Sequence, residues 1–459
     1  MIPVVTPEEM AAVDAAAPEP VGVLIARAGA AVAAAALDLL GGASGRRVVV
    51  VVGPGNNGND GRAAAELLER RGVRVTVHEA ASAPAVLEPA DLVVDAAFGT
   101  GFRGTYGFPD PDGAPVLAVD IPSGVDGLTG LAAGAPAPAV ATVTFAALKP
   151  GLLQGAGPAH CGEVRVADIG LDVSGARIHL VEDADVVAWI PERAADDHKW
   201  RRAVWVVAGS PGMTGAARLC ASAALRGGAG YVRLSVPGDV GPPEPVEAVH
   251  VPFREADWSG ELGADADRFA AVAIGPGLGR ADGTAAAVRR AATELARPLV
   301  LDGDALAALG SDAPALLAAR TAPTVLTPHD GEFERLTGAA PGPDRVAAAR
   351  DLAAATGAVV LLKGPTTTVA APDGAVLLVR AGDARLATAG TGDVLTGLVA
   401  AHLASGADPL RAAAAAAHVH GLAARCGPSR GLVAGDLPEL VPVAWELLLG
   451  GTSFPGVTA

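Results

Sequence analysis

The sequence contains few of the residues that cross-link small secreted proteins or bind metals through sulfur. Its three cysteines, Cys161, Cys220 and Cys426, lie far apart and form no Cys-x-x-Cys pair. This pattern predicts neither a zinc site nor a disulfide framework, and it is typical of proteins in a reducing compartment. We therefore expect a cytoplasmic protein.

Targeting and membrane signals are also missing from the pattern. The N-terminus has no basic stretch followed by an apolar core, so the sequence predicts no signal peptide. Glycine or charge interrupts the apolar segments, as Arg27 does within residues 21–40, and we expect no membrane-spanning segment. The net charge of −16 disfavours nucleic acids and anionic membranes as partners.

Aromatic residues make up only 3% of the chain, whereas hydrophobic residues make up 51% and charged residues 18%. Most of the apolar residues are small, which suits helices packed closely on a sheet, and disorder is not expected. A chain of 459 residues is too long for one ordinary domain, so two or three are expected.

The first part of the chain alternates between strand and helix patterns. A Thr-Pro-Glu-Glu sequence at residues 6–9 predicts a helix start, because it combines a cap, a proline at the first position and a glutamate three residues after the cap. The alternation predicts a doubly wound parallel sheet, whose ligands bind at the carboxyl ends of the strands. The expected helices cover residues 23–40 and 61–71, and the expected strands cover residues 46–52, 74–78, 92–95 and 116–120.

A polar segment at residues 190–197 breaks this pattern, and we expect a domain boundary there. The alternation then restarts, so the sequence predicts an α/β protein with domains at residues 1–190 and 197–445. In the second domain we expect strands at residues 203–208, 272–274, 299–302, 324–326 and 359–363, and a helix at residues 214–226.

A glycine-rich turn with an acid, residues 387–397, is the most informative segment of the second half. Gly390 and Gly392 precede Asp393, and an apolar run that is compatible with a helix follows. Such a turn directs backbone N–H groups and a helix N-terminus at an anion. An aspartate there is suited to take a proton from a hydroxyl that attacks phosphorus, so the turn predicts phosphoryl transfer. The alternative is an ordinary helix start with an acid that favours the dipole.

A second glycine-rich loop, residues 53–61, follows the first predicted strand. It contains G-x-G-x-x-G, and Glu79 lies near the end of the next strand, as in dinucleotide-binding proteins. However, Pro54 removes an N–H group, and the loop carries several asparagines and an aspartate, which suit a hard cation and a polar ligand. An asparagine-rich turn without a ligand is the alternative.

Two further predicted strands end in acids. Asp95 leads into a glycine-rich loop at residues 98–105, and Asp120 leads into Ser123. Because the carboxyl ends of parallel strands meet at one edge of a sheet, these side chains are expected in one crevice. Lys149 is a further candidate for the same place.

Together, the loop at residues 53–61, the segments at 94–101 and 120–124, and the segment at 144–151 resemble the NAD(P)H-hydrate epimerase family, which has a Rossmann-like fold. The resemblance covers most of residues 1–190. It implies a potassium ion bound by Asn57, Asp95 and Ser123. It also implies a substrate site made of Asn56, Asn57, Gly58, Asn59, Asp60, Gly99, Thr100, Gly101, Phe102, Arg103, Gly104, Thr105 and Asp120.

Two positions depart from the usual pattern of that family. Asn59 stands where the family usually has glycine, and Ala26 stands where an acidic residue is usual. We expect that either departure lowers epimerase activity.

The second half contains glycine turns at residues 208–216 and 275–279, a Thr-Pro-His segment at 327–329 and a Lys-Gly segment at 363–364. With the turn around Asp393, these resemble the ribokinase-like fold, and within it the ADP-dependent NAD(P)H-hydrate dehydratases over residues 197–445. The resemblance implies that Ala216, Gly277, His329 and Asp393 contact the hydrated nucleotide. It also implies that Lys363, Gly364, Pro365, Thr366, Thr367, Gly390 and Gly392 contact ADP or AMP.

The two resemblances together imply a metabolite-repair enzyme. The first domain would interconvert the R and S epimers of NADHX and NADPHX, with Asp120 as a candidate acid–base group. The second would dehydrate the S epimer at the expense of ADP, giving AMP and phosphate, with Mg²⁺ as cofactor and Asp393 as base. The family tendency predicts a homo-oligomer. His418 and His420 match no motif, and we expect them to be structural or exposed.

Three other functions are compatible with the residues alone. A kinase of a vitamin precursor or sugar would use the same ribokinase-like fold. The first domain could instead bind a nucleotide without catalysis. A nicotinamide dehydrogenase is supported only by the G-x-G-x-x-G pattern.

Overall fold

The computed structural model describes residues 1–238, 245–253 and 257–450. They form two compact units, one of residues 2–178 and one that begins at residue 179 and includes Met1. The division lies ahead of the polar segment at 190–197, so the first domain ends earlier than residue 190. The reason is that helix α6 (Asp183–Trp189) packs on two helices near the C-terminus, and its Val186 is buried in the C-terminal core.

The N-terminal unit is built on a six-stranded sheet in the order β3-β2-β4-β6-β8-β9. All neighbouring strands are parallel, which confirms the predicted doubly wound sheet. The strands are β2 (Arg47–Val52), β3 (Arg74–Glu79), β4 (Leu92–Ala96), β6 (Val116–Val119), β8 (Ala141–Phe145) and β9 (Glu163–Ala167). Two short strands, β5 (Tyr106–Gly107) and β7 (Gly134–Ala135), pair separately.

Strand β2 is buried on both faces because valines occupy five successive positions, 48–52. Val48, Val50 and Val52 belong to one core cluster with helices, whereas Val49 and Val51 belong to a second cluster on the other face. The sheet is therefore covered on both sides, and polar groups are left at its strand ends.

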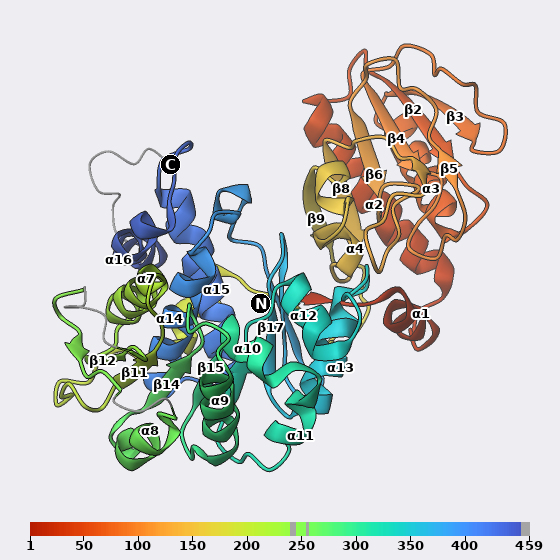
Figure 1. Ribbon diagram of the computed structural model, residues 1–459. Coiled ribbons are helices and arrows are strands. Elements are labelled where there is room, and N and C mark those ends of the chain that lie inside the picture. Colours follow the sequence, from red (N-terminus) through yellow and green to blue (C-terminus); the bar gives the residue numbers. More distant parts are fainter. Residues whose placement is uncertain (239–244, 254–256, 451–459) are drawn as a thin grey trace. The chain divides into compact units, whose positions relative to one another are not determined.

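Two long helices, α2 (Val21–Leu40) and α3 (Asn56–Arg70), pack against each other beside this sheet (Figure 1). By length and apolar composition alone, with a mean hydropathy of 1.9, α2 is the one described helix that would qualify as a membrane span. In this unit Leu24, Ala28 and Val32 of α2 are buried in the core cluster on the sheet. The shorter elements are β1 (Ile2–Val4), α1 (Pro7–Ala15), α4 (Pro150–Leu153) and α5 (Gly157–His160).

The C-terminal unit has a larger sheet, in the order β10-β19-β18-β17-β16-β15-β14-β11-β12-β13. The strands from β17 to β13 are parallel, whereas β17, β18 and β19 form an antiparallel meander. The strands are β10 (Ile178–Leu180), β11 (Ala203–Val207), β12 (Tyr231–Ser235), β13 (Val249–His250), β14 (Ala271–Ile274), β15 (Leu299–Leu301), β16 (Thr324–Leu326), β17 (Val359–Leu362), β18 (Thr367–Ala370) and β19 (Val376–Val379).

Helices cover both faces of this sheet (Figure 1). One face carries α6, α7 (Thr214–Arg226), α14 (Thr391–Ala404), α15 (Pro409–Cys426) and α16 (Leu437–Leu448), which share one core cluster with the sheet. The remaining helices are α8 (Ser259–Asp265), α9 (Asp282–Glu294), α10 (Asp304–Leu309), α11 (Ala313–Leu317), α12 (Asp330–Thr337) and α13 (Arg345–Thr356).

Helices α7 and α14 approach each other very closely. A Cβ atom added to Gly397 of α14 would lie 2.2 Å from the carbonyl oxygen of Cys220 in α7. Only glycine allows this approach of two backbones. The close contact holds the first turn of α14, which carries Asp393, against the core.

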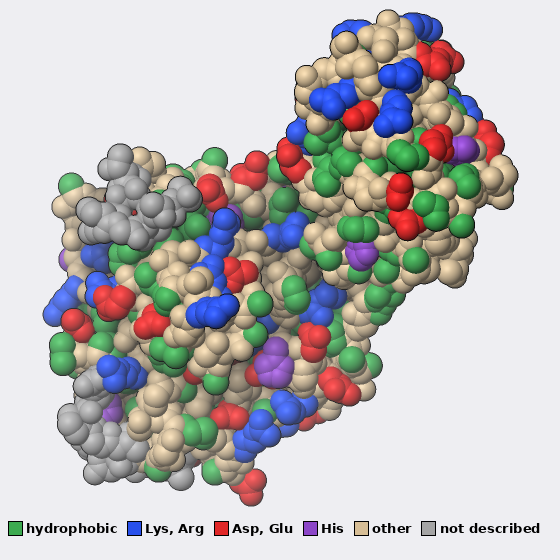
Figure 2. Space-filling view, turned by 90° about the horizontal axis from the view of Figure 1, so that it is seen from above, with side chains coloured by type: hydrophobic (Ala, Val, Ile, Leu, Met, Phe, Trp, Pro, Cys, Tyr) green, Lys and Arg blue, Asp and Glu red, His purple; other side chains and the backbone are tan. Residues whose placement is uncertain are grey.

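The surface of the protein carries charges of both signs. Figure 2 shows acidic and basic side chains interspersed over the visible face of each unit. Many form exposed pairs, such as Arg201 with Asp197 at 2.8 Å and Arg289 with Asp312 at 2.8 Å. Exposed pairs of this kind contribute little to stability, so the fold depends mainly on the apolar cores.

Candidate active sites

The glycine loop of the N-terminal unit leads directly into α3, which begins at Asn56 rather than at residue 61 as predicted. The extended backbone of Gly55 caps the helix, so the asparagines form its first turn instead of a loop. Gly58 lies against the turn itself, because a Cβ atom on it would be 1.9 Å from the carbonyl oxygen of Gly53. The loop is therefore closed tightly at the carboxyl end of β2.

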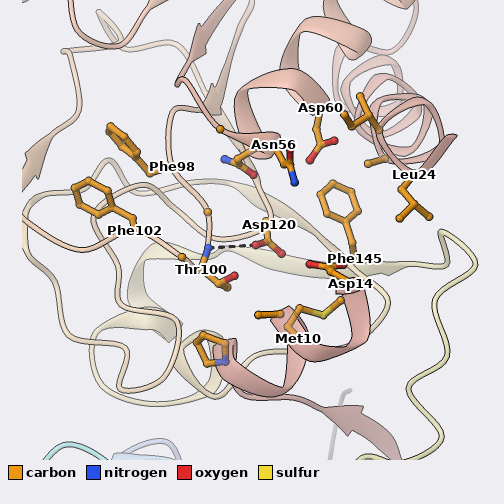
Figure 3. A pocket seen from close by; sticks show the side chains of 18 of the residues that line it. Met10, Asp14, Leu24, Asn56, Asp60, Phe98, Thr100, Phe102, Asp120 and Phe145 are labelled. Atoms are coloured by element: carbon orange, nitrogen blue, oxygen red, sulfur yellow. Dashed lines mark hydrogen bonds between the residues drawn. The ribbon is translucent and has the colours of Figure 1, made fainter. Parts of the chain in front are cut away.

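A cavity of about 490 Å³ opens at this end of the sheet (Figure 3). Its walls come from α1, α2, the start of α3 and the loops after β4 and β6. Of the residues predicted from the sequence, the cavity is lined by Asn56, Asn57, Asp60, Gly99, Thr100, Gly101, Phe102 and Asp120. Gly58, Asn59, Arg103, Gly104 and Thr105 do not line it. Gly58 packs on Gly53, Asn59 accepts a hydrogen bond from Arg62, and Arg103 bonds to the carbonyls of Thr100 and Phe102.

Sequence reasoning did not predict the apolar wall or the acid contributed by the first helices. Leu24 of α2, Met10 and Asp14 of α1, and Phe145 at the end of β8 all line this cavity. The pattern of α1 and α2 showed only that they are helices, and nothing in it marked the face turned to the cavity.

Asp120 lies at the floor of the cavity and is fixed by several donors. Its carboxylate accepts hydrogen bonds from Lys149 Nζ at 2.7 Å, from Thr144 Oγ1 at 3.2 Å and from the N–H group of Thr100 at 3.3 Å. Burial alone would raise the pKa of Asp120, but the charge and hydrogen bond of Lys149 lower it below its ordinary value. The backbone of Asp120 is left-handed, with φ of 67°, an uncommon conformation that directs the side chain into the site.

Lys149 is 1% exposed, and its ammonium group also bonds to Thr144 Oγ1 and to the carbonyl oxygen of Phe145. A buried ammonium group of this kind requires an anionic partner, which Asp120 supplies. The structure therefore brings Lys149 and Asp120 together, as their positions in the sequence indicated.

The residues predicted to bind potassium lie beside this cavity. Asp95 is fully buried and accepts hydrogen bonds from the hydroxyl of Ser123 at 2.5 Å and from its N–H group at 2.8 Å. Burial raises the pKa of Asp95 to about 6, although the bonds from Ser123 oppose the shift. The amide oxygen and nitrogen of Asn57 are buried, and they have no hydrogen-bond partner among the described residues.

The two departures from the epimerase pattern lie outside this cavity. Asn59 points to the outer side of α3, where its oxygen accepts a hydrogen bond from Arg62 at 3.4 Å. Ala26 is exposed on α2, and neither residue lines the cavity. Neither substitution therefore changes the walls of the site.

A second cavity, of about 540 Å³, lies at the carboxyl ends of the parallel strands in the C-terminal unit. Ala216, Gly277, His329 and Asp393, the four residues predicted to contact the hydrated nucleotide, all line it. They come from α7, the loop after β14, the start of α12 and the start of α14. Glu332, Asp304, Arg280 and Arg335 also line the cavity and were not predicted from the sequence.

Asp393 stands in the first turn of α14. The backbone of Gly390, which caps this helix, is left-handed with φ of 92°, so the conformation favours glycine at the turn. Burial raises the pKa of Asp393 to about 6, and the nearby carboxylate of Asp302 adds to the shift while Lys363 opposes it. The group is thus a carboxylate at neutral pH with a proton affinity above that of an ordinary aspartate.

Lys363 ends β17 and lies next to this turn, because a Cβ atom on Gly392 would be 3.4 Å from its Nζ atom. The ammonium group bonds to Asp302 at 2.9 Å and lies 3.5 Å from Glu332. Burial alone would lower the pKa of Lys363, but these two carboxylates raise it. The cation is therefore held charged beside the glycine turn.

None of the residues predicted to bind ADP or AMP, Lys363 included, lines the second cavity. Gly364, Pro365 and Thr366 connect β17 to β18, and Thr367 is the first residue of β18. Of this connection, Lys363 is the residue that the structure shows next to the glycine turn, at Gly392.

Asp302 was not predicted as a site residue, although the signal was present. It follows a buried strand directly, as Asp120 does, and it is 2% exposed. Its carboxylate also accepts hydrogen bonds from Thr327 at 2.8 Å and Thr396 at 2.7 Å. The same strand-end rule that identified the first site applies here.

His418 and His420 of α15 are both buried, in agreement with the structural alternative for them. His418 bonds to Asp183 of α6 at 2.7 Å. Burial lowers the pKa of His420 to about 4, so its ring is neutral.

Comparisons with known proteins agree with this division. A family model described as NAD(P)H-hydrate dehydratase matches residues 204–441, and a model described as YjeF-related protein N-terminus matches residues 21–86 and 78–151. A bifunctional NAD(P)H-hydrate repair enzyme of Salinibacter ruber is 37% identical, over 96% of this chain and 95% of that protein. A protein of the same description from Mycobacterium tuberculosis is 41% identical over 79% of each chain.

Solved structures match the C-terminal unit. The ADP/ATP-dependent NAD(P)H-hydrate dehydratase of Bacillus subtilis, co-crystallised with ATP and Mg²⁺, is 32% identical with a TM-score of 0.53. The match covers 58% of this chain and 97% of that chain. The ribokinase-like architecture predicted from the sequence is confirmed by this likeness.

Proposed function

The chain belongs to the family of bifunctional NAD(P)H-hydrate repair enzymes, with an epimerase domain and a dehydratase domain, and we propose which residues perform each reaction. The N-terminal unit interconverts the R and S forms of hydrated NAD(P)H. The C-terminal unit converts the S form to NAD(P)H and consumes ADP.

The dehydratase must remove a hydroxyl group, which is a poor leaving group. Asp393 takes the proton of the C6 hydroxyl of the substrate while the oxygen of that hydroxyl attacks the β-phosphorus of ADP. The bond between the β-phosphorus and the bridging oxygen breaks, and AMP leaves. The C6–O bond then breaks with its electrons on phosphate, while the ring nitrogen donates its lone pair to C6. Loss of a proton from C5 to the departing phosphate restores the dihydropyridine ring.

The observation that carries this proposal is the position of Asp393. It lines the same cavity as His329, Ala216 and Gly277, and it lies at the N-terminus of α14, where free N–H groups favour phosphate. The raised pKa suits a general base at neutral pH. Lys363, held charged beside Gly392, would stabilise the charge on the transferring phosphoryl group.

The donor set of this cavity fits a magnesium ion. Glu332, Asp304 and Asp393 present carboxylate oxygens to the cavity, and Mg²⁺ prefers hard oxygen ligands shared with nucleotide phosphates. We propose that Glu332 and Asp304 hold Mg²⁺ together with the nucleotide, that the ion would neutralise phosphate charge when bound, and that Asp393 stays available as the base.

The residues beside the first cavity fit a potassium ion. The buried amide oxygen of Asn57 has no partner among the described residues, and Asp95 and Ser123 supply further oxygens close to the same loop. An unsatisfied buried oxygen is costly unless a donor or a cation meets it. We propose that these three residues bind K⁺, which would balance the charge of Asp95 and order the substrate loop around Gly99.

We propose that ADP is the phosphoryl donor and that the enzyme acts in the cytoplasm as a homo-oligomer. The three cysteines form no disulfide among the described residues, which suits a reducing compartment. Light scattering on the purified chain would measure the assembly, and a monomer mass would contradict this part of the proposal.

One experiment separates the two activities. Mixed epimers of NADHX are incubated with the full chain and either ADP or ATP, and the absorbance band of NADH is followed. Complete recovery with ADP requires both activities. Recovery that stops with the R epimer left over would show an inactive epimerase, and no recovery with either nucleotide would contradict the dehydratase proposal.

A further inference from the structure

The first cavity presents two buried carboxyl groups in contrasting surroundings. Asp120 is bonded to a lysine, a hydroxyl and a backbone N–H group. Asp60, in the second turn of α3, is only 7% exposed, and its carboxyl group has no hydrogen bond or ion pair with any other described residue. Figure 3 shows the Asp60 carboxyl directed into the cavity, above Asp120.

An unpartnered carboxyl at such a position is not explained by the fold. Asp60 caps no helix, because α3 begins at Asn56 and is capped by Gly55. Burying an ionised carboxylate without a partner is costly, so the group is expected to remain in its acid form until a ligand arrives. In that form it offers one O–H donor to the cavity.

We propose that Asp60 is the proton donor of the epimerase reaction, and that Asp120, held by Lys149, remains a carboxylate that stabilises the cation formed on the nicotinamide ring. The inference rests on the proposed epimerase function of the N-terminal unit. It replaces Asp120 as the acid–base candidate, because Asp120 is bonded to an ammonium group and gains nothing by holding a proton.

The proton and electron changes balance in this scheme. Asp60 gives its proton to the C6 hydroxyl, and the C6–O bond breaks so that water leaves with both electrons of that bond. The ring nitrogen supplies its lone pair and forms a double bond to C6. Water then adds to either face of C6, the nitrogen recovers its lone pair, and the proton released by this water restores the acid form of Asp60.

The charges around Asp60 favour both stages. The groups that face it are Asp120 below, Asp14 from α1, and Lys149, which is paired with Asp120. Burial raises the pKa of Asp60 to about 8, and the charges of Asp120 and Asp14 add to the shift, so the acid form prevails at neutral pH. Once Asp60 has lost its proton, three carboxylates and one ammonium group surround the cationic ring.

The apolar wall of the cavity supports the same assignment. Figure 3 shows Leu24 and Phe145 on the side of the cavity where Asp60 lies, and Met10 adds to the apolar lining next to Asp14. Exclusion of water keeps the pKa of an acid high and strengthens the interaction between the carboxylates and a ring cation.

The test compares Asp60→Asn with Asp14→Asn in the full chain. Asp14 lines the same cavity, so Asp14→Asn tests the effect of a neighbouring charge, and Glu66→Gln on the exposed face of α3 is the control. Purified (R)-NADHX is the substrate, and the rate at which the S epimer forms is measured from pH 6 to pH 9, with the uncatalysed rate subtracted. ADP-dependent dehydration of (S)-NADHX and thermal unfolding report on the integrity of each variant.

Asp60→Asn is expected to lower kcat by about 10²-fold or more with little change in KM, as for loss of a general acid. The wild-type rate should fall as pH rises past the pKa of Asp60, and the variant should lose this limb. Glu66→Gln should stay within about threefold of wild type at every pH. Asp14→Asn should move the alkaline limb to lower pH, because one charge that raises the Asp60 pKa is gone.

Full epimerase activity in Asp60→Asn, or an alkaline limb that persists in it, would overturn the assignment. If Asp60→Asn unfolds early, Asp60→Glu keeps the acid, and it should retain activity with a displaced alkaline limb. A wild-type chain that forms no S epimer would instead contradict the proposed epimerase function itself.

Discussion

The ammonium nitrogen of Lys363 lies 2.9 Å from Oδ1 of Asp302, although the two residues follow different strands of the C-terminal sheet. β16 lies between those strands, so the pair bridges their ends. Thr327 and Thr396 complete the shell of Asp302, and the lysine has little freedom to turn away from the glycine turn at Gly392.

Asp302→Asn is therefore expected to destabilise the C-terminal unit and to slow dehydration. Removal of Asp302 leaves the ammonium group of Lys363 with only Glu332, at 3.5 Å, as counter-charge, so the cost should lie below the value of about 3–5 kcal/mol for a fully broken buried pair. Urea unfolding followed by the fluorescence of Trp205 and Trp258, both buried in this unit, would measure the loss. Lys363→Met added to Asp302→Asn should recover part of the stability but not the activity, and no recovery would contradict the pairing.

Dehydratase turnover should depend on the ionisation of Asp393. Because burial raises its pKa to about 6, the base is deprotonated above that value, and kcat should fall as pH decreases through about 6. The rate of NADH formation from (S)-NADHX with saturating ADP measures this. A flat profile down to pH 5 would contradict the assignment.

The same pKa predicts opposite effects of Asp393→Asn on stability and activity. A carboxyl whose pKa is raised in the folded state stabilises the fold at low pH, and this stabilisation is lost as pH rises through about 6. Asp393→Asn should therefore be more stable than wild type at pH 8, and this advantage should be smaller at pH 5. Its turnover should fall by about 10²–10⁴-fold. Thermal unfolding at both pH values provides the comparison.

Gly397→Ala should destabilise the contact between α7 and α14. The added methyl group would meet the carbonyl oxygen of Cys220 at 2.2 Å, so the helices must separate, at a cost of about 1–3 kcal/mol. Gly263→Ala in α8 is the control, because nothing lies within 4 Å of its added Cβ atom. That change should be neutral or stabilise by about 0.5–1 kcal/mol, and equal effects at both sites would contradict the packing argument.

Potassium should stabilise the N-terminal unit through Asn57. A ligand that binds only the folded state stabilises it by about 1.4 kcal/mol for each tenfold excess over its Kd. Wild type should melt at a higher temperature in potassium chloride than in tetramethylammonium chloride. Asn59→Ala should show the same difference, because the side chain of Asn59 bonds to Arg62. The two melting temperatures should coincide for Asn57→Ala, and a potassium effect that survives in this variant would place the ion elsewhere.

The sheets were predictable from the sequence because their central strands are buried on both faces. A run of valines such as residues 48–52 is typical of a parallel strand, and β2 has the expected bounds to within one residue at its start. The start of α3 was predicted too late because asparagines are typical of turns, and because the cap residue Gly55 has no side chain that would indicate a helix start. The predicted boundary at residue 190 lies after the division between the two units at residues 178 and 179, because the local composition of α6 does not indicate which unit it packs against.

Site residues were predictable where they lie at the end of a predicted strand, as Asp95 and Asp120 do, or next to a glycine turn, as Asp393 does. Asp302 obeys the same rule, but its partners Lys363 and Thr396 are 61 and 94 residues away, and no local pattern indicates contacts over such separations. The apolar wall formed by Leu24 and its neighbours depends on which side of a helix faces the cavity, and this follows from packing rather than from any motif.

The cap of α12 determines what His329 can offer to a ligand. Its Nδ1 atom accepts from the N–H groups of Gly331 at 3.0 Å and Glu332 at 3.4 Å, so the neutral ring must carry its hydrogen on Nε2. Nε2 lies 3.5 Å from Oε1 of Glu332, which also lines the cavity, so the neutral imidazole is a donor there rather than a proton acceptor. His329 is thereby suited to recognise an oxygen of the coenzyme, such as its carboxamide or a phosphate, and abstraction of a proton is left to Asp393.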